Sequence, residues 1–399
     1  MLDLETAVAR MLAALPAARP SERIPLPESA GRILAETIPS PLDLPPFDNS
    51  AMDGFAVRAS DVLTAKSETP QPLRLRTRIP AGEIFTGELA PGECARLFTG
   101  APLPRGADAV VMQEDTRSEG EQVFILDAVQ PGENVRFHGE DVRHGATLAE
   151  SGNEISAGLI GLLGAAGLCE ITVGPRPVTG LIATGSELRE AGHSLSPGQI
   201  YESNRAMLAP LITHAGGIAK AYPLVPDTLA ATRTALETAF RECDLVITSG
   251  GVSVGEMDFV KAAFAALGGE LQFWKVAIRP GKPFVFGQLG QKFLFGLPGN
   301  PVSAFVTFLL LVRPALRHWQ GARDTALPVF PAVLGEAISN SNDRRHFMRV
   351  HVDAAGKVFS AGKQASHVLA SLARADALLD VPPQSTWAAG TRVNILRGF

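Results

Sequence analysis

The chain has 399 residues, of which 46% are hydrophobic and 19% charged, and its formal net charge is −5 at pH 7. This length suggests two to four globular domains, and the weakly acidic balance without a long basic run argues against nucleic acid as the main partner. The three cysteines, Cys94, Cys169 and Cys243, are too far apart for a C-x-x-C metal or redox motif, and their odd number suits a reducing compartment.

The N-terminal segment and the most apolar stretch both favour a soluble, cytoplasmic protein. The first residues, MLDLETAVARML, carry acidic side chains and lack the basic start and apolar core of a signal peptide. The apolar stretch 302–312 contains Ser303 and Thr307 and is too short to span a bilayer. We therefore expect no membrane-spanning segment.

The first half of the chain predicts a helix and then an inserted β-rich domain. Apolar residues follow helical spacing from Leu4 to Leu15, and Pro16 ends the pattern. From residue 47 to about 145, short β-like runs alternate with Gly, Pro and Asp turns. A Gly/Ala-rich helix at 156–166 and a strand at 171–173 follow, and we expect this stretch to return and pack with the N-terminal helix.

From Val178 onward, strands alternate with helices. Strands are expected at 178–183, 218–225, 244–248, 271–277, 284–287 and 293–296, and helices at 205–215, 228–241, 259–267 and 302–319. Ser203 or Asn204 would cap the first of these helices, and Asp227 or Thr228 the second. Such alternation indicates a mostly parallel sheet covered on both faces.

The predicted fold class is multidomain α/β plus β. Residues 1–46 with 146–176 would form an N-terminal linker or dimerisation domain, into which a β-rich domain of residues 47–145 is inserted. Residues 177–327 would form the α/β domain. Short β-like runs after residue 327 predict a small C-terminal β domain of residues 328–399.

Three loops follow strands of the α/β domain, at the edge where open α/β sheets bind ligands. They are TGSE (184–187), SGGVSVG (249–255) and LPGNP (297–301). The glycines of the middle loop permit close backbone approach, its serines offer hydroxyls, and the next helix presents free N–H groups, as a phosphate site requires. The loop matches neither a P-loop nor a G-x-G-x-x-G fingerprint, and taken alone it fits a flexible turn equally well.

Charged residues near these loops have two interpretations. Asp258, at the start of a helix, either caps that helix or binds a divalent cation such as Mg²⁺. The turn 298–301 is either ordinary or a second helix N-terminus aimed at the same ligand. Lys275, Arg279 and Lys282 either neutralise a phosphate or oxyanion or are surface charges.

Further polar motifs between apolar residues lie in the β-rich region. Together with the loops they closely resemble one family, the molybdopterin molybdenumtransferases of MoeA type, also found as the E domain of gephyrin. The matching segments are PPFDNSAMDGFAVR (45–58), TGAPLPRGADAVVMQED (99–115), GED (139–141), ATGSEL (183–188), GQIYESN (198–204), DLVITSGGVSVGEMDFVK (244–261), FWKVAIRPGKP (273–283) and GLPGNPVSAF (296–305). The resemblance spans nearly the whole chain. Smaller molybdopterin-binding domains share the SGG-x-S-x-G and PGNP motifs, whereas DNSAMDG separates this family from them.

The resemblance implies a reaction in which adenylylated molybdopterin and molybdate yield molybdenum cofactor and AMP with Mg²⁺. It also implies a molybdopterin-binding α/β domain and a homodimer whose active site lies between this domain of one subunit and the β-rich region of the other. Other proteins of molybdenum-cofactor biosynthesis are further candidate partners. A diphosphate and a tetrahedral oxyanion both require N–H donors and cations, and Mg²⁺ requires carboxylates.

The resemblance also carries roles to individual positions. It implies catalytic roles for Asp53, Thr99, Asp141, Glu187, Asp258, Lys275 and Lys282. It implies substrate binding by Ser249, Gly250, Gly251, Ser253, Gly255, Arg279, Pro298, Gly299, Asn300, Arg349 and Ser366, and metal binding by Glu187, Asp227 and Asp258. The sequence departs from the family pattern at two positions. Arg279 stands where some members carry Lys, so a planar guanidinium replaces a compact ammonium charge. Ser186 stands where others have Asp.

Three alternatives remain at this point. The chain could be a non-catalytic scaffold, but the extra domain or long linker expected of one is not visible. It could be a different enzyme built on the shared domain, which would leave residues 1–150 and 328–399 without a role. It could be a paralogue that prefers tungstate to molybdate, which the sequence does not separate.

Overall fold

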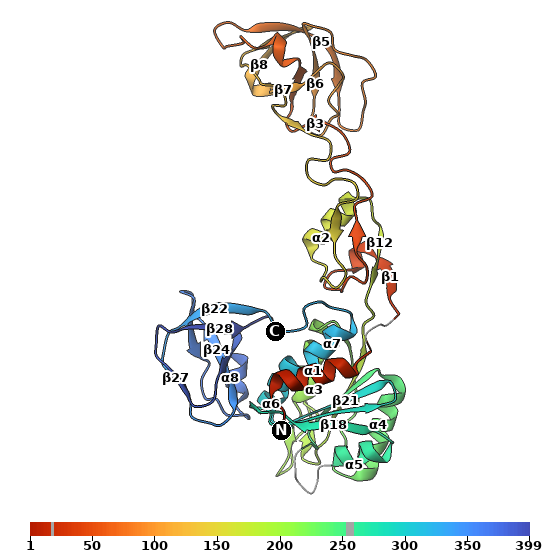
Figure 1. The fold of residues 1–399 in the computed structure, drawn as a ribbon, viewed down its shortest axis with the longest axis vertical. Helices are drawn as coiled ribbons and strands as arrows, with labels where there is room; N and C mark the ends of the chain where they lie inside the picture. The colour runs from red at the N-terminus through yellow and green to blue at the C-terminus, as the bar shows by residue number, and fades with distance from the viewer. Residues whose placement is uncertain (17–19, 253–258) are drawn as a thin grey trace. The chain divides into compact units, whose positions relative to one another are not determined.

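The structure, a computed structural model, describes residues 1–16, 20–252 and 259–399 (Figure 1). The chain divides into two compact units. The first comprises Met1–Glu36, Ser151–Ser156 and Glu170–Phe399, and the second comprises Thr37–Glu150 and Ala157–Cys169. The finer division into four domains, with the boundaries given above, stays a prediction.

The first unit contains a six-stranded sheet in the order β16-β13-β17-β21-β20-β18. Its strands are β13 (Val178–Ala183), β16 (Ile218–Ala221), β17 (Leu245–Ser249), β18 (Glu270–Lys275), β20 (Pro283–Leu289) and β21 (Lys292–Leu297). Strands β16, β13, β17 and β21 run parallel, which confirms the mostly parallel prediction, while β20 is antiparallel to both neighbours. Antiparallel pairing follows from the short turn that joins β20 to β21.

Helices cover both faces of this sheet, as the alternation along β17 requires. Leu245 and Ile247 belong to one core, with α3 (Asn204–His214), while Val246 belongs to a second core, with α4 (Leu229–Glu242) and α5 (Phe259–Ala266). Because successive side chains of a strand point to opposite faces, a strand buried on both faces reads as a continuous apolar run. The predicted α/β layering is confirmed.

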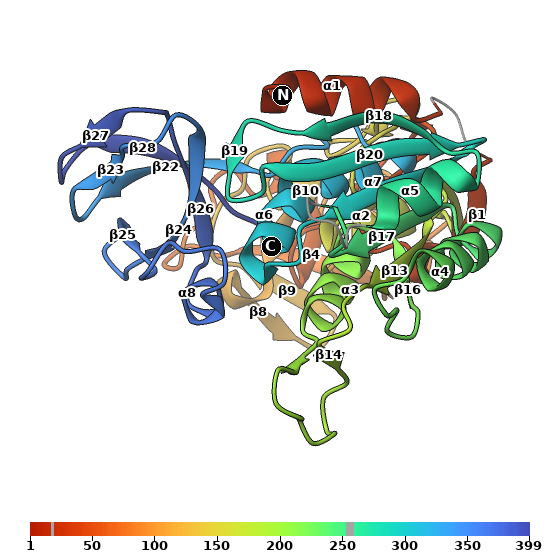
Figure 2. The same cartoon turned by 90° about the horizontal axis from the view of Figure 1, so that it is seen from below.

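The N-terminal helix α1 (Leu4–Ala14) belongs to the α/β core. Asp3 caps it, since its Oδ1 accepts a 2.7 Å hydrogen bond from the Thr6 N–H. Ala7 and Met11 are fully buried in the same cluster as α7 (Arg313–Trp319), and Figure 2 shows α1 along the layer that holds β18. The expectation that α1 packs with the stretch 156–173 is therefore wrong, because its apolar stripe is buried against the α/β domain.

The stretch 156–173 is divided between the two units. Strand β12 (Glu170–Val173) pairs antiparallel with β1 (Glu22–Pro25) in the first unit. Helix α2 (Ala157–Ala165) belongs to the second unit, where it contacts β11 (Thr147–Ala149). The helix and the strand were both predicted, within a residue at each end.

The predicted last helix of the α/β domain is built from three segments. These are α6 (Pro301–Thr307), a π-helical turn η4 (Phe308–Val312) and α7. The apolar stretch 302–312 is buried throughout, so it serves as a core helix. Across the described residues, no helix combines the length and apolar character needed to span a bilayer.

The C-terminal region is a β domain, as predicted, with one strand that was not foreseen. Its sheet has the order β19-β24-β25-β22-β28-β26. The elements are β22 (Val329–Leu334), β24 (Arg345–Val352), β25 (Lys357–Ser360), α8 (Leu369–Ala373), β26 (Ala377–Val381) and β28 (Arg392–Leu396), with a separate pair β23 (Ile338–Asn340) and β27 (Ser385–Trp387). The short strand β19 (Ile278–Arg279) leaves the α/β domain and pairs parallel with β24.

The second unit is β-rich, as predicted. Its sheet has the order β7-β4-β6-β5-β9-β8. The strands are β4 (Gly54–Val57), β5 (Gln71–Ile79), β6 (Glu93–Leu97), β7 (Ala109–Met112), β8 (Thr116–Glu119) and β9 (Gln122–Ile125), and two-stranded pairs join β2 (Ile38–Pro39) to β11 and β3 (Asn49–Ser50) to β10 (Val135–Arg136). Along β4, Phe55 and Val57 enter one core and Ala56 enters another.

Candidate functional site

The three loops expected to bind ligand lie at one level of the α/β sheet. Ala183 is opposite Ser249, and Ser249 is opposite Leu297, so β13, β17 and β21 end side by side. Two backbone hydrogen bonds of 3.1 Å extend the pairing into the loops, from Thr184 N–H to the Ser249 carbonyl and from Gly250 N–H to the Leu297 carbonyl. Strands that end together place their loops around one crevice.

Glycine is required where these loops touch. Gly250 has a φ of +92°, and a Cβ built there would lie 2.7 Å from the Thr184 carbonyl oxygen. A Cβ built at Gly299 would lie 3.6 Å from the Gly250 Cα. The backbones therefore approach each other closely, and a side chain at position 250 would force them apart.

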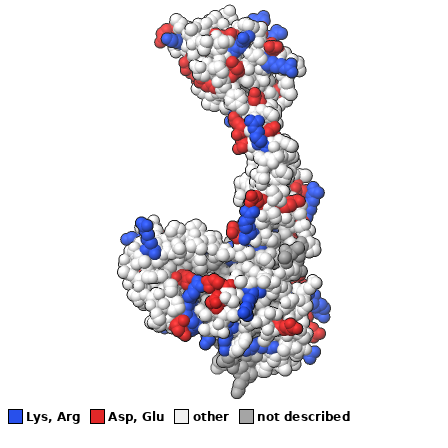
Figure 3. All heavy atoms as spheres, in the orientation of Figure 1, with Lys and Arg blue, Asp and Glu red and all other residues white. Residues whose placement is uncertain are grey.

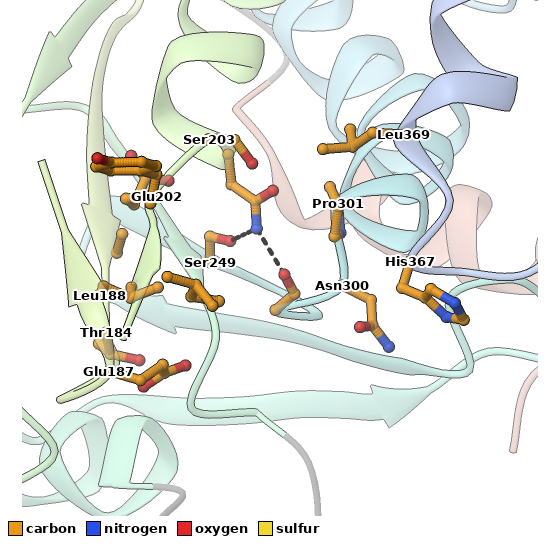
Figure 4. Close-up of a pocket in the computed structure, with 15 residues that line it drawn as sticks. Thr184, Glu187, Leu188, Glu202, Ser203, Ser249, Asn300, Pro301, His367 and Leu369 are labelled. Atoms are coloured by element: carbon orange, nitrogen blue, oxygen red, sulfur yellow. Dashed lines mark hydrogen bonds between the residues drawn. The ribbon is translucent and has the colours of Figure 1, made fainter. Parts of the chain in front are cut away.

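Two cavities adjoin the loops. The larger, of about 550 Å³, lies between the loops, the start of α3 and the C-terminal segment that carries His367 and Leu369 (Figure 4). The smaller, of about 310 Å³, is lined by residues from all three loops and by Asp227. Thr184, Glu187, Gly299 and Asn300 line both cavities.

Asn204 ties two of the loops together. Its Nδ2 donates a 2.6 Å hydrogen bond to Ser249 Oγ and a 2.7 Å bond to the Gly299 carbonyl (Figure 4). Its buried Oδ1 has no protein partner within the described part of the chain. The sequence suggested only that Ser203 or Asn204 caps α3. Neither side chain makes such a cap, and Asn204 begins the helix with its amide turned to the loops.

Glu187 and Asp227 supply the carboxylates of the smaller cavity. Asp227 Oδ2 accepts a 2.9 Å hydrogen bond from the Ser186 N–H, and Ser186 Oγ accepts a 3.0 Å bond from the Asp227 N–H. Helix α4 is capped by Thr228, whose Oγ1 accepts from the Ala231 N–H at 3.2 Å. The alternative of Asp227 as the cap is therefore wrong, and its carboxylate lines the cavity.

The smaller cavity contains part of a ligand set for a divalent cation. Within residues 1–16, 20–252 and 259–399, no group of three His, Cys, Asp or Glu side chains is arranged to hold a metal. Mg²⁺ commonly takes one or two protein carboxylates and completes its octahedron with water and substrate phosphate. Glu187 and Asp227 fit that pattern. Ser253, Gly255 and Asp258 lie outside the described residues.

The three cations of the segment 275–282 do not line either cavity. Lys275 Nζ lies 3.6 Å from the centroid of the Trp274 ring, and Lys282 is exposed. Arg279 lies on β19, opposite His346 of β24. Arg279 therefore belongs to the sheet of the C-terminal domain, whereas Lys275 ends β18 in the α/β sheet.

Arg349 is a fully buried cation. Its Nε donates to Ser371 Oγ at 3.0 Å, and Nη2 donates to the carbonyls of Lys363 and Ala365 at 2.9 and 3.2 Å. Among the residues that the structure describes, Nη1 has no hydrogen-bond partner. Burial, and then the charge of Arg279, lower the pKa of Arg349 to about 10. It stays protonated at neutral pH, so the C-terminal domain keeps a positive charge in its interior.

Ser366 joins the C-terminal domain to the third loop. Its Oγ accepts a 3.2 Å hydrogen bond from Asn300 Nδ2, and its carbonyl accepts a 3.2 Å bond from the Val302 N–H at the start of α6. The structure therefore brings together Ser366 and Asn300, two of the residues predicted to bind substrate. The neighbouring Ala365 carbonyl accepts from Arg349, which links that cation to the same segment.

His346 is a buried residue that the sequence did not single out. It is 3% exposed, and neither ring nitrogen has a hydrogen-bond partner among the described residues. Burial, followed by the charges of Arg279, Arg349 and Arg344, lowers the pKa of His346 to about 4. The ring is thus neutral at pH 7. No local pattern could have identified it, because its neighbours come from strand pairing with β19.

In the second unit the structure pairs Asp53 with Thr99. Asp53 Oδ1 accepts from the Thr99 N–H at 2.8 Å and from Thr99 Oγ1 at 2.7 Å. These bonds, the backbone one first, lower the pKa of Asp53 below its usual range. The carboxylate is exposed and ionised at neutral pH.

Asp141 belongs to this unit as well. It is exposed, and its backbone N–H donates to the Leu44 carbonyl at 3.0 Å, while the Gly139 N–H donates to the Pro45 carbonyl at 2.9 Å. The predicted polar motif 139–141 therefore lies beside Pro45, at the start of the predicted motif 45–58. On the face of the molecule seen in Figure 3, basic and acidic side chains are interspersed, and the coloured residues form no broad surface of one sign there.

Comparisons with known proteins agree with this architecture. Three family models match the chain: "MoeA N-terminal region (domain I and II)" over residues 2–167, "Probable molybdopterin binding domain" over 180–318 and "MoeA C-terminal region (domain IV)" over 331–397. Molybdopterin molybdenumtransferase 2 of Mycobacterium tuberculosis is 41% identical over 379 residues, covering 93% of this chain and 94% of that protein. The molybdopterin molybdenumtransferase of Haemophilus influenzae is 38% identical over 385 residues, covering 95% and 94%.

A solved structure gives the same result for the fold. The molybdopterin biosynthesis MoeA protein of Pyrococcus horikoshii aligns with a TM-score of 0.85 at 32% identity, covering 100% of both chains. The likeness therefore extends over the α/β domain, the β-rich unit and the C-terminal β domain together. The chain belongs to the MoeA family of molybdopterin molybdenumtransferases.

Proposed function

We propose that this protein is a molybdenum insertase, which transfers molybdate into adenylylated molybdopterin, releases AMP and forms molybdenum cofactor. The observation that carries the proposal is the meeting of three loops at one edge of the α/β sheet, beside a cavity of about 550 Å³, with two of the loops linked by Asn204. Close backbone approach at Gly250 and a polar cavity wall suit a phosphorylated ligand.

The chain's own residues would divide the work as follows. Ser249, Asn300 and the backbone of the glycine-rich loops would bind and orient the phosphates, together with Gly251, Pro298 and Gly299. Arg349, whose Nη1 is unpaired in the described structure, supports the proposed oxyanion site with Ser366. Lys275, Arg279 and Lys282 are proposed to complete the positive surroundings. A planar guanidinium such as that of Arg279 matches two oxygens of one anion.

Magnesium is part of the proposal. Glu187 and Asp227 line one cavity and would hold the ion, joined by Asp258. The ion would neutralise phosphate oxygens and polarise the phosphoanhydride. Asp53, Thr99 and Asp141 are proposed as further catalytic residues, and the ionised carboxylate of Asp53 is held in place by its two hydrogen bonds to Thr99.

We further propose that the protein works as a cytoplasmic homodimer in which Asp53 and Asp141 of one subunit complete the site of the other. Its three cysteines are free thiols, which suits a reducing compartment. Other proteins of molybdenum-cofactor biosynthesis would deliver the adenylylated substrate and receive the product.

The decisive experiment mixes purified protein with adenylylated molybdopterin, Mg²⁺ and either molybdate or tungstate. We expect AMP release that depends on molybdate, together with reconstitution of an apo-molybdoenzyme. Omission of Mg²⁺ should stop release, and an Asp227→Ala variant should require more Mg²⁺. Absence of molybdate-dependent AMP release would overturn the proposal, and faster release with tungstate would change the metal assigned to it.

A further inference from the structure

The hydroxyl group of Ser249 lies at the wall of the larger cavity, where its hydrogen-bonding direction matters. Ser249 ends β17, is 4% exposed and lines the cavity of about 550 Å³. A serine hydroxyl can both donate and accept, and its proton turns toward whichever acceptor is near. The role that Ser249 takes toward a ligand is therefore set by its protein neighbours.

Asn204 is the neighbour that sets this direction. Its amide nitrogen has two hydrogens and donates one bond to Ser249 Oγ at 2.6 Å and one to the Gly299 carbonyl at 2.7 Å (Figure 4). A carbonyl oxygen can only accept, so the amide must turn its nitrogen, and not its oxygen, toward Gly299. Ser249 Oγ is consequently the acceptor in its contact with Asn204, and the Ser249 proton points elsewhere.

No protein acceptor takes up that proton. Within the described part of the chain, the bond from Asn204 is the only hydrogen bond of Ser249 Oγ. Thr184 Oγ1 is also buried and has no partner among the described residues. Ala183 is opposite Ser249, so the two hydroxyl groups belong to the adjoining ends of β13 and β17, and both residues line the same cavity. Two hydroxyl protons thus remain for a ligand there.

A buried asparagine elsewhere in the chain shows what a purely structural amide looks like. Asn340, 1% exposed, donates from Nδ2 to the carbonyls of Arg344, Val381 and Pro382, and its Oδ1 accepts from Asn342. All its polar atoms are satisfied by the protein. Asn204 differs, because one donor is directed to a hydroxyl at a cavity and its buried Oδ1 has no partner among the described residues. A buried acceptor without a partner costs stability, which packing alone does not explain.

We propose that Asn204 is a positioning residue, which makes the Ser249 hydroxyl a hydrogen-bond donor for an anionic oxygen of the substrate. A hydroxyl that accepts one hydrogen bond is polarised and donates the next more strongly. A phosphate oxygen only accepts, so it matches a hydroxyl whose proton is free. The inference rests on the proposed function, which supplies the phosphate, and it adds to that function a residue that acts through Ser249.

The test is a double-mutant cycle on anion affinity in the full chain. Calorimetric titration with AMP and with inorganic pyrophosphate compares wild type, Asn204→Ala, Ser249→Ala and the double variant. We expect Ser249→Ala to weaken binding by about tenfold or more and Asn204→Ala by about three- to tenfold. On the Ser249→Ala background, Asn204→Ala should change affinity by less than about twofold, because the hydroxyl that it orients is gone.

Asn204→Asp is a second variant of nearly the same shape. Its carboxylate only accepts, so the Ser249 proton turns toward it and away from the cavity. The loss of anion affinity should again be smaller on the Ser249→Ala background. The matched control is Asn340→Ala, which should lower the melting temperature but leave anion affinity within about twofold of wild type.

A structural tether gives a different result. If Asn204 only holds the loop of Gly299, each change at position 204 weakens binding equally on both backgrounds, and this outcome would overturn the proposal. Equal affinity of Ser249→Ala and wild type would overturn it even if Asn204→Ala fails to fold, as would a wild type that binds neither anion. Coupling between the two positions without molybdate-dependent AMP release would count against the insertase reaction alone.

Discussion

At the scale of single residues, β24 buries two basic side chains that respond differently to burial. Arg349 has its pKa lowered to about 10 and so keeps its charge at neutral pH, whereas His346 has its pKa lowered to about 4 and loses it. Arginine tolerates the loss of water because its unperturbed pKa is so high, while histidine begins close to neutrality. The strand thus places one permanent charge and one neutral ring beside Arg279.

The histidine predicts a dependence of stability on pH. The unfolded ring has a pKa near 6.5 and the folded ring about 4, so only the unfolded state binds a proton between these values. Stability is therefore lost as pH falls through this window and levels off below it. Urea denaturation should show about 2 kcal/mol less stability at pH 4.5 than at pH 7 from this residue. His346→Leu should remove that part of the difference, whereas His214→Ala, at an exposed helix position, should retain it.

Asp53 gives a second prediction at this scale, with the same sign, because its folded pKa is lowered as well. Its folded pKa lies below the usual range of an aspartate because Thr99 donates two hydrogen bonds to the ionised form. The stabilisation is present above the unfolded pKa and disappears as pH falls through the folded one. Carbon-13 NMR titration should find the Asp53 pKa higher in Thr99→Val than in wild type. Thr77→Val, in the same unit, should leave it unchanged, and an unchanged pKa in Thr99→Val would mean that the hydroxyl does not act on the carboxylate.

At the scale of elements, the buried apolar strand β17 ends in a glycine turn. In this turn Gly250 packs closely against the two neighbouring loops. Gly250 and Gly268 make a matched pair, because both have positive φ, of +92° and +83°. A Cβ at position 268 would meet nothing within 4 Å, whereas at position 250 it would meet the Thr184 carbonyl. Gly268→Ala should therefore cost only the backbone penalty, about 1–2 kcal/mol.

Gly250→Ala should cost more, about 3 kcal/mol or more, because the loops must also move. Guanidinium denaturation of both variants measures the difference, and titration with AMP measures whether the cavity still binds nucleotide. Equal loss of stability in the two variants would show that the close contact between the loops contributes nothing.

Element prediction from the sequence succeeded where the signal is local. The strand 178–183 was predicted to the residue, since apolar runs between turn residues identify strands. The position of the ligand-binding loops at one edge of the sheet could also be predicted, because parallel strands end at the same edge. The pairing of β19 with β24, the packing of α1 and the tether from Asn204 depend on residues far apart in the chain. Such contacts leave no periodic signal, and His346 escaped notice for the same reason.

At the scale of the whole molecule, the predicted site residues are divided between the two compact units. Asp53, Thr99 and Asp141 belong to the second unit, and Glu187, Asp227, Arg349 and Ser366 belong to the first. The proposed homodimer makes this division testable, because a two-fold symmetric dimer repeats each shared site twice.

Mixed dimers provide that test. Asp53→Ala and Glu187→Ala proteins should each be inactive, but after subunit exchange an equimolar mixture should recover about a quarter of wild-type AMP release, since half the dimers keep one intact site. Asp53→Ala mixed with Asp141→Ala should recover no activity. Both residues belong to the second unit, so each site of the mixed dimer receives one of the two altered residues. A strict monomer by light scattering that retains full activity would contradict the shared site.

The packing of α1 also has a consequence for biosynthesis. Met11 enters the same core as Phe273 and Leu316, which the ribosome adds about 260 residues or more later. At about 5–20 residues per second, the helix waits roughly 10 to 50 seconds for its partners. During that time the apolar stripe of the helix is exposed on the nascent chain. The β-rich unit lies in sequence between the helix and these core residues, so it has time to fold first. Translation rate and early chaperone contact at this helix should therefore govern the yield of native protein.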